Sequence, residues 1–157
     1  MKKECAYNQL PQMTSQVGNL VLRLTLAVVM WPHGAQKVLG WFGGSGFSAT
    51  YETFTDKMGI PAIFALAAIL SEFLAPIFLV FGCLTRLASL FIAITMSVAM
   101  TYNWHNGFFM NWYGNQKGEG VEYQILYVGA ALALFLIGAG KYSIDHVVMK
   151  KYCSKEA

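Results

Sequence analysis

The chain has 157 residues and a formal net charge of +3, and 56% of its residues are hydrophobic while only 12% are charged. About a quarter of the residues of an average soluble domain are charged, so this composition excludes an ordinary soluble protein and favours a membrane protein. The length allows one domain over residues 1–157, and the basic residues form no groove pattern of the kind that nucleic-acid binding needs.

Four apolar runs follow one another along the chain. Each is close to the ~20 residues that an α-helix needs to cross ~30 Å of hydrocarbon. Open strands are excluded because their backbone amides would stay unpaired in lipid. We therefore predict an all-α membrane protein, a four-transmembrane-helix bundle with the lipid bilayer around it. The predicted helices cover about residues 17–39, 60–81, 87–104 and 121–138, between a polar N-terminal tail and a basic C-terminal tail.

The basic residues predict the orientation of these helices. Four spans place both termini and the second loop on one side, and short loops rich in Lys and Arg stay in the cytoplasm. The richer side carries Lys2, Lys3, Arg86, Lys141, Lys150, Lys151 and Lys155, and the opposite side carries Lys37, Lys57 and Lys117. We therefore expect both termini to be cytoplasmic.

The chain has three cysteines, Cys5, Cys83 and Cys153, and all fall on the predicted cytoplasmic side, where thiols stay reduced. No C-x-x-C pair is present, which argues against a thiol–disulfide relay within the membrane. We expect these cysteines to be unpaired and structural.

The two predicted outer loops are rich in aromatic residues. In the first, the flexible turn 40–46 precedes Phe47, Tyr51 and Phe54 at helical spacing, which predicts a short amphipathic helix on the bilayer surface or over the mouth of the bundle. The second loop, 103–120, contains aromatic side chains that either anchor it in the interface or form the wall of a site for an aromatic ligand.

Ionisable residues within apolar spans are costly, and by default they face the protein interior and mark function. Here they fall into two predicted layers. The inner layer contains Arg23, Glu72 and Arg86, and the outer layer contains His33, Gln36, Lys37, His105 and Glu122. Small residues on the helix faces of Glu72 and Glu122 predict that both carboxylates point at the packed interior.

Glu72 is the most informative of these residues. Burial alone favours its neutral form, whereas a nearby Arg23 or Arg86 would hold it ionised. Pro76 also leaves the carbonyl of Glu72 without its helical donor, so that one turn offers a carboxylate and a free carbonyl. Two interpretations stay open: an ion pair that joins the first two helices, and a group that handles a proton or binds a polar ligand.

His33 and His105 are both predicted at the outer mouth. An imidazole there can be a metal or haem ligand, a proton carrier, or a donor to a quinone oxygen. A bis-His haem is the less favoured alternative because it needs facing imidazoles and a wide apolar slot. We expect no metal site.

Several of these motifs occur together in one known family. The stretch Leu22-Arg23-Leu24, then His33-Gly34-Ala35-Gln36-Lys37-Val38 and Gly40-Trp41-Phe42-Gly43-Gly44, resembles the first helix and loop of the DoxX family. Glu72 with Gly82-Cys83-Leu84-Thr85-Arg86 resembles its second helix and turn, and Glu122-Tyr123 resembles the start of its fourth helix. The resemblance covers about residues 17–140.

This resemblance implies a four-helix protein of the bacterial inner membrane that is associated with redox chemistry. Our first hypothesis is a subunit that binds a quinone-like or other aromatic molecule between its helices, without a redox cofactor of its own, so that a redox partner protein supplies electrons. His33, Gln36 and Lys37 would bind carbonyl oxygens, Tyr102 and His105 would complete the pocket, and Glu72 with Arg23 would hold a proton. Arg86 and Glu122 are further candidate binding residues. The alternative is a non-enzymatic scaffold or transport element, and homo-oligomers fit either hypothesis.

Overall fold

The computed structural model describes the backbone of residues 2–153 and the side chains of residues 14–152, and all regular structure in this part of the chain is helical. This confirms the all-α prediction. The main helices are α1 (Lys2–Val38), α2 (Gly46–Glu52), α3 (Ala62–Phe81), α4 (Thr85–Asn103), α5 (Glu122–Ile137) and α6 (Ile144–Cys153). Three short helical turns, η1 (Trp41–Gly43), η2 (Thr53–Lys57) and η3 (Trp104–Asn106), lie between them.

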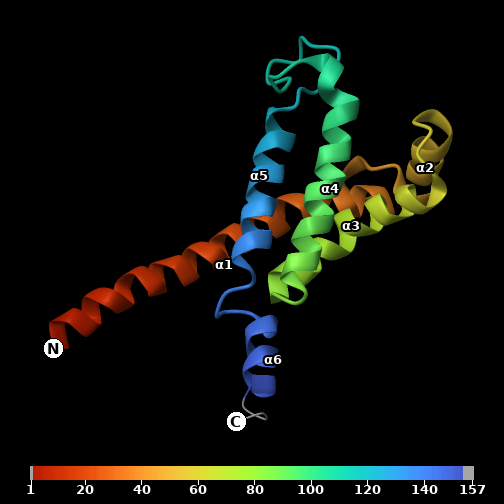
Figure 1. Cartoon of the computed structure of the whole chain (residues 1–157). Helices are drawn as coiled ribbons and strands as arrows, with labels where there is room; N and C mark the ends of the chain where they lie inside the picture. Colours follow the sequence, from red (N-terminus) through yellow and green to blue (C-terminus); the bar gives the residue numbers. More distant parts are fainter. Residues whose placement is uncertain (1, 154–157) are drawn as a thin grey trace.

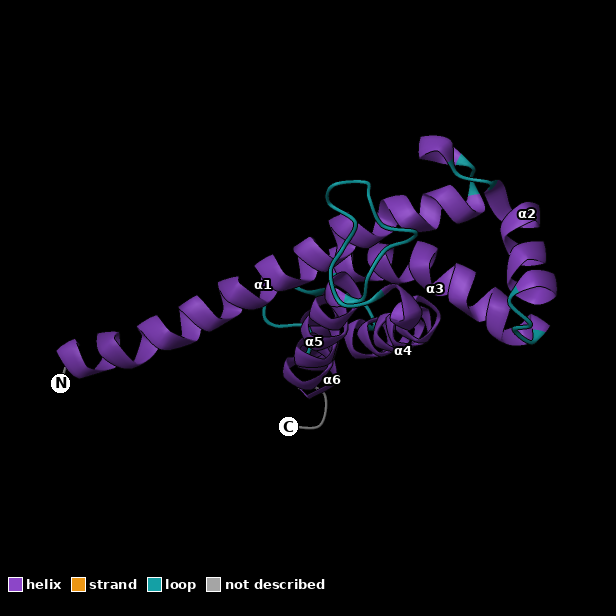
Figure 2. Cartoon of the chain, turned by 90° about the horizontal axis from the view of Figure 1, so that it is seen from above, coloured by secondary structure: helices purple, strands orange, loops and turns teal. Residues whose placement is uncertain are grey.

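The four longest helices pack as two antiparallel pairs, α1 with α3 and α4 with α5 (Figure 1). Seen from above, α1 and α3 lie lengthwise while α4 and α5 point along the line of sight, so the two pairs cross steeply (Figure 2). The arrangement therefore differs from four near-parallel rods. The contact between α3 and α4 joins the pairs into one unit.

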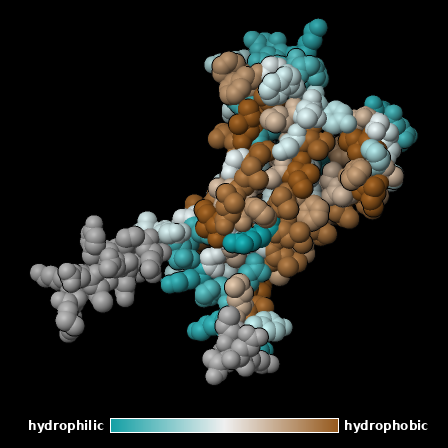
Figure 3. Space-filling model, in the orientation of Figure 1, coloured by the Kyte–Doolittle hydropathy of each residue, from teal (hydrophilic) through white to brown (hydrophobic). Residues whose placement is uncertain are grey.

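The molecular surface is apolar around the middle of the helices. Figure 3 shows a broad hydrophobic band across one face, with hydrophilic residues above and below it. By length and composition, Ala62–Phe81 and Thr85–Asn106 can each cross a membrane, and α5 is an apolar helix of 16 residues. The side chains of Asn19, Arg23 and His33 interrupt the apolar run of α1 and lower its mean hydropathy.

Two elements differ from the sequence-based expectation. Helix α1 begins at Lys2 and not near residue 17, because the polar tail is built largely from good helix formers that extend the helix once it exists. The expected C-terminal tail forms α6. The short helix expected in the first loop is present as α2, and η2 follows it directly.

The core lies where the two pairs cross. It is formed by side chains from all four long helices, including Met30, Leu79, Ile92 and Leu134. Small residues such as Ala35 and Ala131 are also completely buried, which lets the backbones approach closely in an apolar solvent.

The closest approach brings Gly34 of α1 against α3. A Cβ atom at Gly34 would overlap the carbonyl group of Glu72 and the Cα atom of Phe73. Because Pro76 has no N–H, the Glu72 carbonyl has no helical donor, and this carbonyl is the group that the Gly34 backbone meets. The kink of α3 and the glycine of α1 therefore fit each other.

Replacing this glycine tests the close approach. We expect Gly34→Ala to destabilise the protein by about 2 kcal/mol or more, because the added methyl group must push two backbones apart. Gly18→Ala is the matched control on the same helix, since nothing lies within 4 Å of its Cβ position and alanine favours a helix. Thermal unfolding in detergent gives the melting temperature of each variant. Equal melting temperatures for Gly34→Ala and Gly18→Ala would show that α1 and α3 are not in close contact at Gly34.

Candidate functional site

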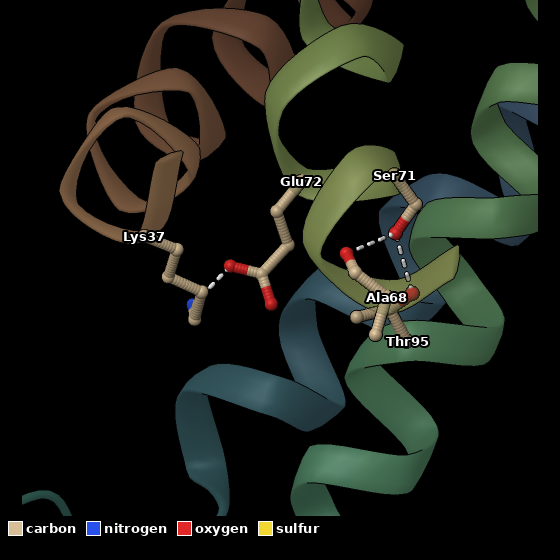
Figure 4. A network of polar contacts seen from close by, with 5 residues as sticks. All are labelled: Lys37, Ala68, Ser71, Glu72 and Thr95. Carbon is tan, nitrogen blue, oxygen red and sulfur yellow. Dashed lines mark hydrogen bonds and ion pairs between the residues drawn. The ribbon is translucent and has the colours of Figure 1, made fainter. Parts of the chain in front are cut away.

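A buried ion pair joins α1 to α3. Lys37 donates to the carboxylate of Glu72, whose side chain is only 5% exposed, while that of Lys37 is 25% exposed. Figure 4 shows the two side chains reaching toward each other from neighbouring helices. The residue before Glu72 in α3 points the other way, since the Ser71 hydroxyl lies 2.7 Å from the hydroxyl of Thr95 on α4. Adjacent residues of α3 thus bind two different helices.

Aromatic side chains of α5 complete this cluster. The ring of Tyr123 lies 6.4 Å from the ring of His33 and 5.3 Å from that of Tyr127, centroid to centroid. His33, one helical turn before Lys37 on α1, links these rings to the ion pair. We call the five residues His33, Lys37, Glu72, Tyr123 and Tyr127 the crossing site.

The two tyrosine hydroxyls of the crossing site differ. The hydroxyl of Tyr127 donates to the carbonyl of Leu26 in α1. The hydroxyl of Tyr123 is buried, and it has no hydrogen-bond partner within the described part of the chain. Such a group is costly unless something binds it, so the Tyr123 hydroxyl is available to a ligand.

The small residues on the face of Glu122 predicted that this face of α5 packs into the interior. That prediction is wrong, because Gly129 lies on this face and the space beside it is open. The buried face of α5 carries Tyr127, Ala131 and Leu134 instead. Their spacing of four and three residues, continued back to Tyr123, is the signal that identifies this face.

Arg23 does not reach Glu72. Its guanidinium, with the residue 2% exposed, donates to the carbonyls of Ala139 at 2.8 Å and Tyr142 at 2.6 Å. The side-chain amide of Asn19 donates to the carbonyl of Gly138 at 2.7 Å. The α5–α6 linker, residues 138–143, exposes these carbonyls where α5 ends, and α1 supplies the missing donors. The predicted inner layer is therefore corrected: Glu72 pairs with Lys37, and Arg23 binds backbone.

Asp145 at the start of α6 holds the turn between α3 and α4. Its carboxylate accepts the N–H groups of Leu84 at 2.8 Å and Thr85 at 2.9 Å, and its own N–H donates to the carbonyl of Gly82 at 3.0 Å. This caps the N-terminus of α4 with a residue from another helix. We call this end of the molecule, with residues 82–85 and 138–145, the clasped end.

Three other predicted site residues, Arg86, Tyr102 and Glu122, form their hydrogen bonds away from the Lys37–Glu72 pair. Arg86 is exposed at the clasped end and donates to the carbonyl of Leu136 at 3.4 Å. At the opposite end, the Tyr102 hydroxyl donates to the carbonyl of Met58 at 3.3 Å, and the carboxylate of Glu122 accepts the indole N–H of Trp112 at 2.8 Å.

The sequence also singled out Gln36, His105 and the three cysteines. Gln36 lies beside His33 on α1 and donates to the carbonyl of Phe42 at 3.3 Å. His105 is exposed in η3. Cys83 has a free thiol, whereas Cys5 and Cys153 lie outside the described side chains. Of the predicted set, the structure brings together His33, Gln36, Lys37 and Glu72.

Comparison with known proteins identifies similar sequences. The DoxX family model matches residues 18–112, more than half of the chain. An uncharacterized protein of Haemophilus influenzae is 34% identical over 143 residues, which cover 90% of this chain and 89% of that protein. Inner membrane protein YqjF of Escherichia coli is 29% identical over 143 residues, covering 87% of this chain and 95% of YqjF. No solved structure matches.

A double-mutant cycle tests the ion pair. Lys37→Met leaves the buried carboxylate of Glu72 without its partner, and we expect a loss of about 3 kcal/mol in the free energy of unfolding. The double variant Lys37→Met/Glu72→Met removes both charges and should regain most of that loss. Lys57→Met, at an exposed position of η2, is the control and should unfold like the parent. If the effects of the Lys37 and Glu72 substitutions on the free energy of unfolding were additive, the two side chains would not interact in the folded protein.

The role of Asp145 can be measured at single amides. Asp145→Ala removes the acceptor of two N–H groups, so hydrogen exchange at Leu84 and Thr85 should become faster and stability should fall by about 1 kcal/mol. The exposed residue Glu52 provides the control variant Glu52→Ala. Unchanged exchange at both amides in Asp145→Ala would rule out the cap.

Proposed function

The chain belongs to the DoxX family, and on that basis we propose that it is an integral protein of the bacterial inner membrane whose four long helices cross the bilayer. The two long apolar helices, the apolar α5 and the name of the relative YqjF support this proposal. Both termini lie in the cytoplasm, in accord with the excess of Lys and Arg on that side. The clasped end then faces the cytoplasm, and the loop around Trp112 faces outward.

Within the membrane, the crossing site binds a quinone-like or other aromatic small molecule. The observation that carries this proposal is the buried, unpartnered hydroxyl of Tyr123 beside His33 and the Lys37–Glu72 pair. Carbonyl oxygens of a quinone need hydrogen-bond donors in apolar surroundings, and the hydroxyl of Tyr123, the imidazole of His33 and the ammonium of Lys37 supply them. His33 is exposed on α1, so a ligand can reach it from the bilayer.

Proton handling at this site belongs to the Lys37–Glu72 pair. Reduction of a bound quinone to the hydroquinone takes up two electrons and two protons. The ammonium of Lys37, whose side chain is 25% exposed, can give the two protons one after the other and regain each from water. Arg23, which we first expected in this role, is engaged by the carbonyls of the linker. The sequence contains no flavin or nucleotide motif, so the electrons come from a redox partner protein.

Titration of the purified protein with a soluble quinone tests this function. We expect saturable binding that weakens about tenfold in His33→Ala, which loses a donor to the ligand, and in Glu72→Gln, which loses the charge that holds the Lys37 ammonium in place. Tyr123→Phe should weaken binding with little effect on folding, since its hydroxyl has no partner in the described protein. His105→Ala is the matched control and should bind like the parent.

Two outcomes would reject the proposal. One is the absence of saturable binding, and the other is equal binding by the parent and by both His33→Ala and Glu72→Gln. If these variants also assemble normally with partner proteins that co-purify with the parent, the scaffold function that the sequence left open takes precedence.

A further inference from the structure

We propose that the clasped end binds the phosphate group of an anionic phospholipid, with one acyl chain of that lipid in the groove between α3 and α4. This site is separate from the crossing site and does not depend on its ligand. It consists of two adjoining hollows, one with cationic side chains in its wall and one that is apolar.

The first hollow is a cavity of about 830 Å³ at the clasped end. Its wall includes the cationic side chains of Arg86 and Lys141, together with apolar residues such as Ile137 and Met149. A phospholipid headgroup region has this same mixture of anionic phosphate and apolar glycerol-ester carbons. Basic pockets between membrane helices are known sites for anionic headgroups.

The charges in this cavity are not balanced. Asp145 is the acidic residue in its wall, but two backbone N–H groups occupy its carboxylate. Arg86 has one long hydrogen bond, to Leu136, and no acceptor for its other N–H groups within the described residues. An anion at Arg86 and Lys141 would therefore satisfy donors that the protein leaves free.

The apolar hollow is a groove of about 240 Å³ between α3 and α4. Leu84 and Leu87 form part of its wall and also part of the wall of the cavity, so the two hollows meet at these side chains. Along α3 the groove extends from Phe78 to Ala67. The eleven helical steps from Ala67 to Phe78 rise about 16 Å, close to the ~15 Å thickness of one leaflet of hydrocarbon.

Charge and shape together favour a lipid over other occupants. A free phosphate ion would use the cavity and leave the groove unexplained. A helix of another protein would fill the groove but would not need the cations beside it. An anionic phospholipid occupies both hollows at once, with its headgroup at the interface and one chain along α3.

Native mass spectrometry of the full-length protein in detergent tests this site, with dioleoyl phosphatidylglycerol as the anionic probe and dioleoyl phosphatidylcholine as the neutral one. We expect about tenfold tighter binding of the anionic lipid, and loss of this preference in Arg86→Gln. Arg86→Lys keeps the charge and should keep most of the preference. Lys117→Gln removes one exposed charge at the other end and serves as the control.

A second variant tests the groove. Ala67 is exposed at its far end, so Ala67→Phe should obstruct the acyl chain without disturbing the core, and should weaken both lipids while leaving the headgroup preference. Equal affinity for the two lipids in the parent, or equal losses in Arg86→Gln and Lys117→Gln, would overturn the proposal. So would complete displacement of the lipid by millimolar inorganic phosphate, which would identify a free-phosphate site.

Discussion

The close contact between Gly34 of α1 and the backbone of Glu72 in α3 determines where the rest of the structure can form. In lipid, helices gain little from burying apolar surface, so close packing and polar contacts must hold them together. Gly34 allows the close packing, and Lys37, one turn further along α1, then reaches the Glu72 carboxylate. His33, on the other side of Gly34, is directed toward Tyr123 of α5. One backbone contact therefore brings three helices to the crossing site.

The same physical constraint explains the clasped end. Carbonyl groups that are buried where a helix ends must find donors within the protein. Gly138 and Gly140 have positive φ angles, so the chain turns after α5 and directs carbonyls of the α5–α6 linker toward α1. The side chains of Arg23 and Asn19 donate hydrogen bonds to these carbonyls. Arg23, which is 2% exposed, thus closes the fold, whereas the proposed ligand site uses residues nearer the C-terminal end of α1.

Helix α3 separates the two proposed ligand sites. Glu72 faces α1 and belongs to the crossing site, whereas the preceding residue, Ser71, bonds to Thr95 of α4 and lies in the wall of the α3–α4 groove (Figure 4). A lipid chain in that groove and a small molecule at the crossing site would therefore contact successive residues of one helix.

The sequence by itself determined the apolar helices and the family, and it singled out Glu72 as a candidate site residue, because hydrophobic runs, short motifs and a carboxylate in an apolar segment are local properties. It predicted Arg23 or Arg86 as the partner of Glu72 and placed Lys37 in the other layer, since depth counted along each helix takes no account of how the helices cross. Only the tertiary structure decided this, by the steep crossing of the helix pairs, which brings Lys37 to Glu72 and the α5–α6 linker to Arg23. The cap that Asp145 provides was equally hidden, because its partners lie 60 and 61 residues away in the chain.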